Sequence, residues 1–304
     1  SRKKSRELNE KLIKLALISA AAISILTTFG ILFSILFEAI EFFKLRSFWY
    51  FITGTTWSPG VIGSQFGALP IFAGTFVITI IALGVAIPIG LGSAIYMSEY
   101  ASPKVRDYLK PLLEILAGIP SVVYGFFAAI TVAPLVVKAA EMVGLEATFN
   151  SALASGIVMG IMIIPTISSL SDDVIRAVPD SQRKAAFGLG MTHGETIKDI
   201  VLPSAMPGII SASLLALSKA LGETMVVVMA AGLRPNLSWN PLEDMTTVTV
   251  TIVNALVGDF EFSSPETLSA FALGLVLFVV TLILNMISLS LIRKFKEKYK
   301  VNTL

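Results

Sequence analysis

The chain has 304 residues, of which 55% are hydrophobic and only 14% are charged, and its formal net charge is +2. This composition excludes an ordinary soluble globular protein, and so small a net charge does not indicate nucleic-acid binding. The sequence has no cysteine and one histidine, His193. Disulfides, thiolate metal sites and a multi-histidine cluster are therefore excluded, and we expect no cofactor or metal on the chain.

Several apolar segments are long enough to cross a bilayer as helices, which takes about 20 residues. They are apolar throughout rather than alternating, which favours helices over the strands of a β-barrel. The first segment is longer than the core of a signal peptide, which has about 7–15 residues, so we expect a retained span. We predict an all-α integral membrane protein with six spans, at residues 13–37, 69–97, 111–137, 152–171, 207–233 and 268–292.

Basic residues indicate how these spans are oriented. Most of the 23 lysines and arginines lie in the two tails and in segments 98–110 and 172–206, which the six spans place on one side. The other side has Lys44, Arg46, Lys138 and Arg234. We therefore expect both termini to be cytoplasmic.

Three regions are expected along the chain. Residues 1–67 comprise the N-terminal tail, the first span and an outer segment; residues 68–292 form a core with five spans and the cytoplasmic loop 172–206; residues 293–304 are a cytoplasmic tail. The aromatic outer segment 38–68 is typical of chain that lies along the membrane interface or packs as a small cap. The acidic outer segment 234–267 fits either a solvated linker or a docking surface.

Residues 184–203, KAAFGLGMTHGETIKDIVLP, predict a polar helix-turn-helix between two apolar segments. Gly190 allows a sharp turn, and Thr192 is expected to cap the second helix, with Glu195 completing a capping box. The second helix is expected to end before Pro203. Such a hairpin is a rigid body that can transmit force, although its composition also fits an ordinary cytosolic hairpin.

The spacing of the Ala-Ala pair, the glycine and the Ile-x-Leu-Pro ending resembles the EAA loop of type I ABC importer permeases, with a lysine in place of the usual leading glutamate. This resemblance implies docking on separate ATPase subunits through Lys184, Ala185, Ala186, Gly190, His193, Glu195, Ile200, Leu202 and Pro203. We expect His193 to be an exposed polar residue rather than a pH sensor. Because the sequence has no G-x-x-x-x-G-K-[ST] motif, ATP and Mg are expected on the partner ATPase, and the chain itself is not expected to be an enzyme.

Lys219 and Glu223 lie four residues apart in the predicted fifth span, so a continuous helix would place them on one face. Each charge costs about 2.5–3.5 kcal/mol at membrane depth, so both should face protein or water. They predict either an ion pair that neutralises itself at a helix interface or two residues that line or latch a substrate path.

Prolines in the predicted third and fourth spans point to broken helices. Pro120 frees a backbone carbonyl, which Ser121 or Tyr124 can satisfy, or these hydroxyls can donate to an oxyanion. Pro165, followed by Thr166, repeats the pattern. A plain packing kink explains the first proline equally well.

The segments LSKALGETMVVVMAAG, AGIPSVVYG and IMIIPTISSLSDDVIRAVP resemble the phosphate-specific ABC permeases, and LGETM resembles the PstC subunit rather than PstA. The resemblance implies a type I ABC importer permease fold in a prokaryotic inner or plasma membrane, with phosphate as the solute. It implies a path or gate formed by Lys219, Glu223, Thr224, Ser121, Tyr124 and Thr166. The implied partners are a PstA-like second permease subunit, two PstB-like ATPase subunits, an extracytoplasmic PstS-like phosphate-binding protein and membrane lipid, with no nucleic acid.

Three alternatives stay open on the residues alone. The solute could be another oxyanion, such as sulfate or molybdate. A proton-coupled secondary transporter could use Lys219 and Glu223 as a relay, although a gradient-driven carrier needs no motor-docking hairpin. A membrane anchor or scaffold without transport is the third alternative.

Overall fold

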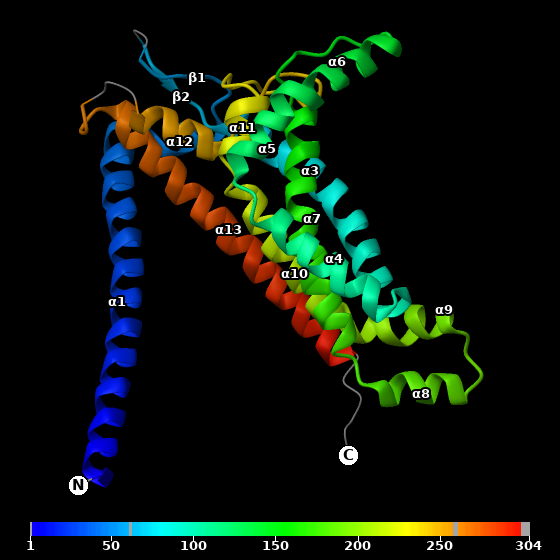
Figure 1. Ribbon diagram of the computed structural model, residues 1–304. Coiled ribbons are helices and arrows are strands. Elements are labelled where there is room, and N and C mark those ends of the chain that lie inside the picture. The colour runs from blue at the N-terminus through cyan, green and yellow to red at the C-terminus, as the bar shows by residue number, and fades with distance from the viewer. Residues whose placement is uncertain (1, 61–62, 258–260, 299–304) are drawn as a thin grey trace.

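The computed structural model describes residues 2–60, 63–257 and 261–298. Within these ranges the chain is largely helical, with one two-stranded hairpin (Figure 1). In chain order the elements are α1 (Arg2–Leu45), α2 (Phe48–Thr53), β1 (Trp57–Ser58), β2 (Gln65–Phe66), α3 (Leu69–Ile95), α4 (Pro103–Ala117), α5 (Ser121–Phe127), α6 (Ala133–Met142), α7 (Ala152–Arg176), α8 (Asp180–Gly188), α9 (His193–Thr196), α10 (Leu202–Leu221), α11 (Met225–Ala230), α12 (Val248–Val257) and α13 (Pro265–Lys298). Three π-helical segments adjoin these helices, at Tyr96–Tyr100, Ala128–Val132 and Ile197–Val201.

The 6 helical stretches that are long and apolar enough to cross a membrane confirm the predicted fold class. They are Glu10–Leu45, Leu69–Tyr100, Ser121–Met142, Ala152–Arg176, His193–Leu221 and Pro265–Lys294. The predicted positions of the third and fifth spans were wrong. The third span starts after Pro120, because the chain is extended at that residue (φ −58°, ψ 138°) and α4 forms a separate, charged helix before it. The fifth ends at Leu221, because residues 222–224 break the helix.

The two ends of the molecule differ in what they carry (Figure 1). The start of α1, the end of α13 and the α8–α9 hairpin all point to the lower end of the molecule in this view, which we call the hairpin end, although α1 stands apart from the other two. The strands, α6, α11 and α12 lie at the opposite end, which we call the cap end.

The centre of the fold is the contact between α3 and α7, which cross the molecule side by side. Glycines bring the two backbones together: a Cβ on Gly156 would lie 2.7 Å from Ile81 Cγ2, and one on Gly160 would lie 2.8 Å from the Ala82 carbonyl oxygen. A Cβ on Gly90 would lie 2.9 Å from Ile167. Small residues at such positions allow the close helix contact that stabilises proteins in lipid.

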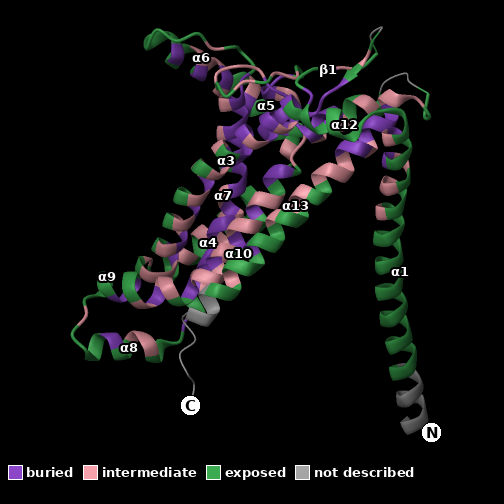
Figure 2. Cartoon of the chain, turned by 180° about the vertical axis from the view of Figure 1, so that it is seen from behind, coloured by how far each residue is buried: buried purple, intermediate pink, exposed green. Residues whose placement is uncertain are grey.

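Helix α1 stands apart from this core. It approaches α13 near the cap end and then diverges from it toward the hairpin end (Figure 1). Most of its length is exposed, as the green ribbon in Figure 2 shows. Because its exposed side chains are largely apolar, such as Leu17 and Leu26, this surface suits lipid or another membrane helix rather than water.

The aromatic segment 38–68 forms a small cap, one of its two predicted arrangements. Trp57 pairs with Phe66 across the antiparallel β1–β2 ladder, and Phe42, Phe51 and Phe66 meet edge to face with ring centroids 5.4–5.5 Å apart. Val248 of α12 and Leu268 of α13 belong to the same buried cluster. The cap thus ties the end of α1 to the last two helices.

Candidate functional site

The α8–α9 hairpin has the predicted helix-turn-helix form. Gly190 adopts φ +84°, a left-handed conformation that non-glycine residues rarely adopt. Thr192 caps α9 through a capping box: its Oγ1 accepts from the Glu195 N–H, and Glu195 Oε2 accepts from the Thr192 N–H at 2.8 Å. The turn is therefore held by its own hydrogen bonds.

The predicted end of the second helix before Pro203 was wrong. The π-helical segment Ile197–Val201 follows α9 directly and leads into α10, so His193–Leu221 is one continuous helix. Proline lacks the N–H that an α-helix interior needs, and here it lies in the first turn of α10, directly after the π-helical segment. The hairpin is consequently a direct extension of a membrane-spanning helix.

The residues predicted to dock on an ATPase fall into three groups by exposure. Ala186 is buried, and the last three residues of the set, at the α10 junction, are half-buried: Ile200, Leu202 and Pro203. The exposed members are Lys184, Ala185, Gly190, His193 and Glu195. The prediction that His193 is exposed is confirmed, with its side chain 47% exposed.

The tip of the hairpin presents apolar side chains that sequence reasoning missed. Leu189 is 84% exposed and Phe187 is 46% exposed. Exposed leucine and phenylalanine at a polar turn are typical of a contact surface for another protein. The sequence signal for this exposed tip was Leu189, a hydrophobic residue between Gly188 and Gly190.

Ion pairs join the hairpin to the spanning helices. Arg183 of α8 donates to Glu99 Oε1 at 2.8 Å, and these side chains are only 16% and 6% exposed. Arg183 also donates to the carbonyl oxygens of Ile175, at 3.0 Å, and Val178 at the end of α7. His193 Nε2 lies 3.9 Å from the second Glu99 oxygen. Glu99 thus contacts both arms of the hairpin from the end of the α3 span.

A second group of charges joins α4 to α7. Arg106 donates to Asp172 at 2.7 Å, and Lys110 lies 2.5 Å from Asp173. The Asp172 side chain is fully buried, and its hydrogen bond raises the pKa of Arg106 above its ordinary value. We call these two groups, Glu99–Arg183 and Arg106–Asp172 with their neighbours, the charged joint. A cavity of about 480 Å³ lies beside it and is lined by Arg106, Arg176 and Arg183.

The predicted pairing of Lys219 with Glu223 was wrong. Because α10 ends at Leu221, the four-residue spacing does not place them on one helix face. The Glu223 carboxylate instead accepts from the N–H groups of Met225 (3.0 Å) and Val226 (3.3 Å) at the start of α11. Lys219 is exposed and has no ion pair with any carboxylate in the described ranges.

The break between α10 and α11 is held from outside as well. Thr249 of α12 donates to the Glu223 carbonyl oxygen at 2.8 Å. Helix α11 packs against α5 so closely that a Cβ on Gly125 would lie 2.8 Å from Met229 Sδ. The two short helices that follow breaks, α5 and α11, are therefore neighbours.

The second break, between α4 and α5, uses a tyrosine as expected. Tyr124 is 8% exposed, and its hydroxyl donates to the carbonyl oxygen of Leu116, in the last turn of α4, at 2.9 Å. Ser121 is half-buried at the start of α5, near the same break. Thr224 lies in the α10–α11 break, whereas Thr166 lies within α7, and no hydrogen bond of the described residues joins it to the others.

Comparison with known proteins identifies the family. The profile described as "Binding-protein-dependent transport system inner membrane component" matches residues 86–298. The chain belongs to this family. A curated relative named "Probable ABC transporter permease protein YqgH" from Bacillus subtilis is 34% identical over 251 residues, covering 83% of this chain and 78% of the relative. A "Phosphate transport system permease protein PstC" from Mesorhizobium japonicum is 34% identical over 287 residues, covering 87% and 84%.

Solved structures show the same fold at low sequence identity. A bacterial alginate ABC transporter in complex with an alginate pentasaccharide-bound periplasmic protein matches 90% of this chain and 92% of its own, with a TM-score of 0.62 at 16% identity. The MetNI methionine ABC transporter matches 73% of this chain and 93% of its own, with a TM-score of 0.53. The type I ABC importer permease fold is thereby confirmed, and the chain is a multi-pass inner-membrane permease.

In this permease, sequence reasoning missed the ion pairs of the charged joint. Glu99, Arg106 and Asp172 are dispersed charges in the sequence, and Arg183 lies 84 residues from Glu99. Single charged residues at the ends of apolar segments were the available signal, because such residues either face water or pair. Which of them pair could not be read from their spacing.

Proposed function

We propose that this chain is a transmembrane subunit of an ATP-driven importer that moves inorganic phosphate into the cytoplasm. Separate ATPase subunits would drive it through residues 184–203. The single observation that carries the coupling is the hairpin itself: an exposed apolar tip at Leu189 on a rigid extension of α10, joined by Glu99 and Arg183 to the spanning helices.

The orientation follows from the basic residues. The start of α1, the end of α13 and the hairpin lie at one end (Figure 1), and these are regions that carry most of the lysines and arginines. Cytoplasmic segments are enriched in these residues. Both termini and the hairpin are then cytoplasmic, and the cap end faces outward.

The charged joint supports a mechanical role for the hairpin. A force on the tip reaches α10 directly, α7 through the hydrogen bonds of Arg183 to the Ile175 and Val178 carbonyls, and the end of the α3 span through Glu99. Because α3 and α7 form the centre of the fold, a movement of the hairpin tilts the core helices rather than one loop. The opposite end of the path opens as a result.

Phosphate as the solute rests on the names of the relatives and on one free cation. Several relatives at 30–34% identity are phosphate transport permeases, and Lys219 is an exposed cation in a spanning helix with no carboxylate partner in the described part of the chain. Such a charge is costly in lipid, so it should face water, a partner subunit or a passing anion. The Glu223 carboxylate is turned to backbone N–H groups, which reduces its repulsion of an anion.

The assembly that this function requires has two permease subunits, two ATPases and an extracytoplasmic phosphate-binding protein. The long exposed face of α1 offers apolar surface for the second permease subunit or for lipid. Binding energy for phosphate then belongs mainly to the delivery protein, because a path that held the ion tightly would not release it.

Uptake by the assembled transporter in proteoliposomes tests the proposal. We expect uptake of radiolabelled phosphate only with ATP on the ATPase side and with the binding protein on the other side, and we expect no effect of an uncoupler. Uptake that collapses with the uncoupler would make the chain a secondary transporter. If unlabelled sulfate or molybdate inhibited this uptake more strongly than unlabelled phosphate, the solute would be that oxyanion, and the chain would still be an ABC importer permease.

A further inference from the structure

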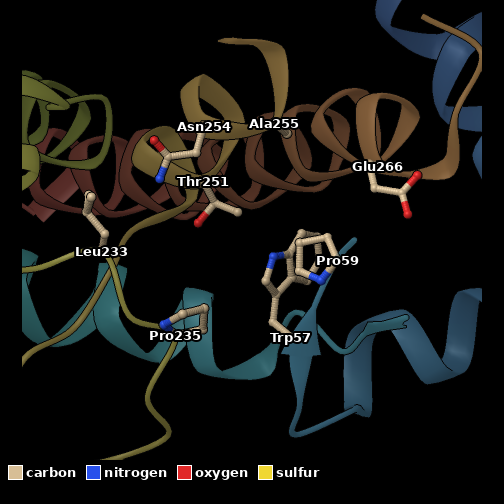
Figure 3. Close-up of a pocket in the computed structure, with 8 residues that line it drawn as sticks. All are labelled: Trp57, Pro59, Leu233, Pro235, Thr251, Asn254, Ala255 and Glu266. Atoms are coloured by element: carbon tan, nitrogen blue, oxygen red, sulfur yellow. The ribbon is translucent and has the colours of Figure 1, made fainter. Parts of the chain in front are cut away.

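A small pocket at the cap end combines apolar side chains with a carboxylate. Its volume is about 210 Å³, and its lining comes from four separate elements (Figure 3): Trp57, Pro59, Leu233, Pro235, Thr251, Asn254, Ala255 and Glu266. Sites for small-molecule ligands usually measure about 300–1,000 Å³. This pocket is therefore sized for a single side chain.

The walls of the pocket are suited to an aliphatic chain with a cationic head. Pro59, Pro235 and Leu233 provide apolar surface, and the Trp57 ring is fixed by edge contacts with Phe51 and Phe66 at 6.3 and 5.5 Å. Lysine and arginine bury their methylene groups along such surfaces and keep the charged head polar. An indole is also the side chain over which cations bind best.

The polar groups of the pocket indicate which charge its occupant should carry. Among the described residues, Glu266 in the first turn of α13 is the one charged residue that lines the pocket, and it lies at the opposite end of the pocket from Leu233 and Pro235 (Figure 3). No ion pair or side-chain hydrogen bond of the carboxylate is formed with the described residues. Asn254 adds an amide from α12. No lysine or arginine is among the described residues that line the pocket, so an anion such as phosphate would meet this carboxylate.

Other acidic residues of the same outer region do not share this arrangement. The Glu243 carboxylate already accepts from the amides of Asn236 at 2.8 Å and Asn240 at 3.1 Å. Glu261 is exposed and does not line the pocket. Of these three glutamates, Glu266 is the one that lines an apolar pocket and whose carboxylate has no partner among the described residues.

We propose that this pocket is a receptor for one lysine or arginine side chain of the extracytoplasmic solute-binding protein. The inference rests on the proposed function for its partner and orientation. Charge complementarity between such a side chain and Glu266 would fix the register of docking, and the tryptophan and prolines would exclude water around it. Leu233, 55% exposed at the pocket's edge, provides apolar surface for the surrounding contact.

Binding of the purified phosphate-binding protein to the assembled transporter in nanodiscs tests the proposal. We expect Glu266→Gln to weaken binding about tenfold, as for one member of a desolvated charge pair, and to flatten its salt dependence. The matched control Glu261→Gln removes the same charge outside the pocket and should change the affinity less than about twofold, as for a rim charge. Equal effects of the two variants on binding would overturn the proposal that this pocket receives a cationic side chain.

The side chain that enters the pocket is found with charge reversal. Glu266→Lys should abolish binding, and one Lys→Glu or Arg→Glu substitution on the binding protein should restore part of it. If no such substitution restores binding, the proposal fails. If wild-type transporter does not bind the phosphate-binding protein at all, while another solute-binding protein does, the proposed solute fails and the pocket is then tested with that protein.

Site-specific cross-linking identifies the occupant independently. Because the chain has no cysteine, Ala255→Cys places a single thiol in the pocket wall. We expect a bifunctional reagent to join it to the binding protein, with Glu261→Cys giving much less product. Cross-linking from Ala255→Cys to the second permease subunit, or to nothing, would show that the pocket has a different role.

Discussion

The two ends of this permease are held together by different interactions. At the cap end, Phe42, Phe51 and Phe66 pack edge to face, whereas at the hairpin end Glu99 with Arg183 and Arg106 with Asp172 form the charged joint. Aromatic packing depends on the shape of the buried rings and is little affected by salt, whereas a buried ion pair leaves an uncompensated charge when one partner is removed. The cap end therefore depends on close packing, and the hairpin end depends on keeping each buried charge paired.

The largest expected effect is at the cap end. Phe51→Ala removes a fully buried ring and should lower the free energy of unfolding by about 3–5 kcal/mol, the usual cost of such a cavity. Thermal unfolding of the purified transporter measures it. As control, Trp49→Ala removes a side chain that is 74% exposed and should change stability little. If both substitutions had the same effect, the cap would not be a packed unit.

The hairpin end should respond to loss of Arg183. Arg183→Ala leaves the buried Glu99 carboxylate without its partner, which costs about 3 kcal/mol for a buried pair. We expect phosphate uptake per ATP hydrolysed to fall at least about tenfold, because the hairpin loses its attachment to the core helices. Asp180→Asn is the control, since Asp180 lies 3.6 Å from Arg183 but is 83% exposed. Unchanged coupling in Arg183→Ala would remove the joint from the mechanism.

A double-mutant cycle separates this pair from general destabilisation. The loss of unfolding free energy in the double variant Glu99→Ala/Arg183→Ala should be clearly smaller than the sum of the losses in the two single variants. The reason is that the second substitution removes the unpaired charge left by the first. Additive losses would show that the two residues act independently.

Substitution of Gly190 in the turn of the hairpin should have a smaller effect than loss of Arg183. Gly190→Val forces a β-branched residue into φ +84°, at a cost of about 1–2 kcal/mol, and should weaken association with the ATPase subunits. Gly188→Val is the control, because a Cβ there meets nothing within 4 Å and Gly188 has no positive φ. The stoichiometry of the purified complex, with its ATPase activity, checks the difference. Equal association of the two variants would contradict a docking role for the turn.

The smallest effect is expected for substitutions of Glu223, and these distinguish helix capping from an ion pair with Lys219. Because its carboxylate caps α11, Glu223→Gln keeps an acceptor oxygen and should retain most of the uptake, whereas Glu223→Ala should lose about 0.5–2 kcal/mol of capping energy. Lys219→Ala should reduce phosphate uptake by the same factor in either background. A strong interaction between the two positions in uptake assays would revive the ion pair that the structure does not contain.

Much of the fold could be predicted because its causes are local. The six spans follow from runs of apolar residues, since only helices and closed β-barrels satisfy backbone polar groups in lipid and these runs lack the alternation of barrel strands. The capping box of Thr192 and Glu195 follows from a spacing of three residues. The end of α10 at Leu221 could not be predicted, because apolar residues continue in the sequence beyond the Gly222–Thr224 break. The break depends on tertiary contacts, namely the packing of α11 on α5 and the hydrogen bond from Thr249 to the Glu223 carbonyl.

By itself, then, the sequence determined the fold class, the hairpin and the family, because apolar run length, turn glycines and loop spacing are properties of neighbouring residues. Only the tertiary structure decided that Glu99 contacts both arms of the hairpin, that Glu223 caps a helix instead of pairing with Lys219, and that Glu266 and Trp57 line one pocket. The first and third depend on residues that helix packing brings together from distant segments. The second depends on the break between α10 and α11, which a hydrogen bond from Thr249 of α12 helps to hold.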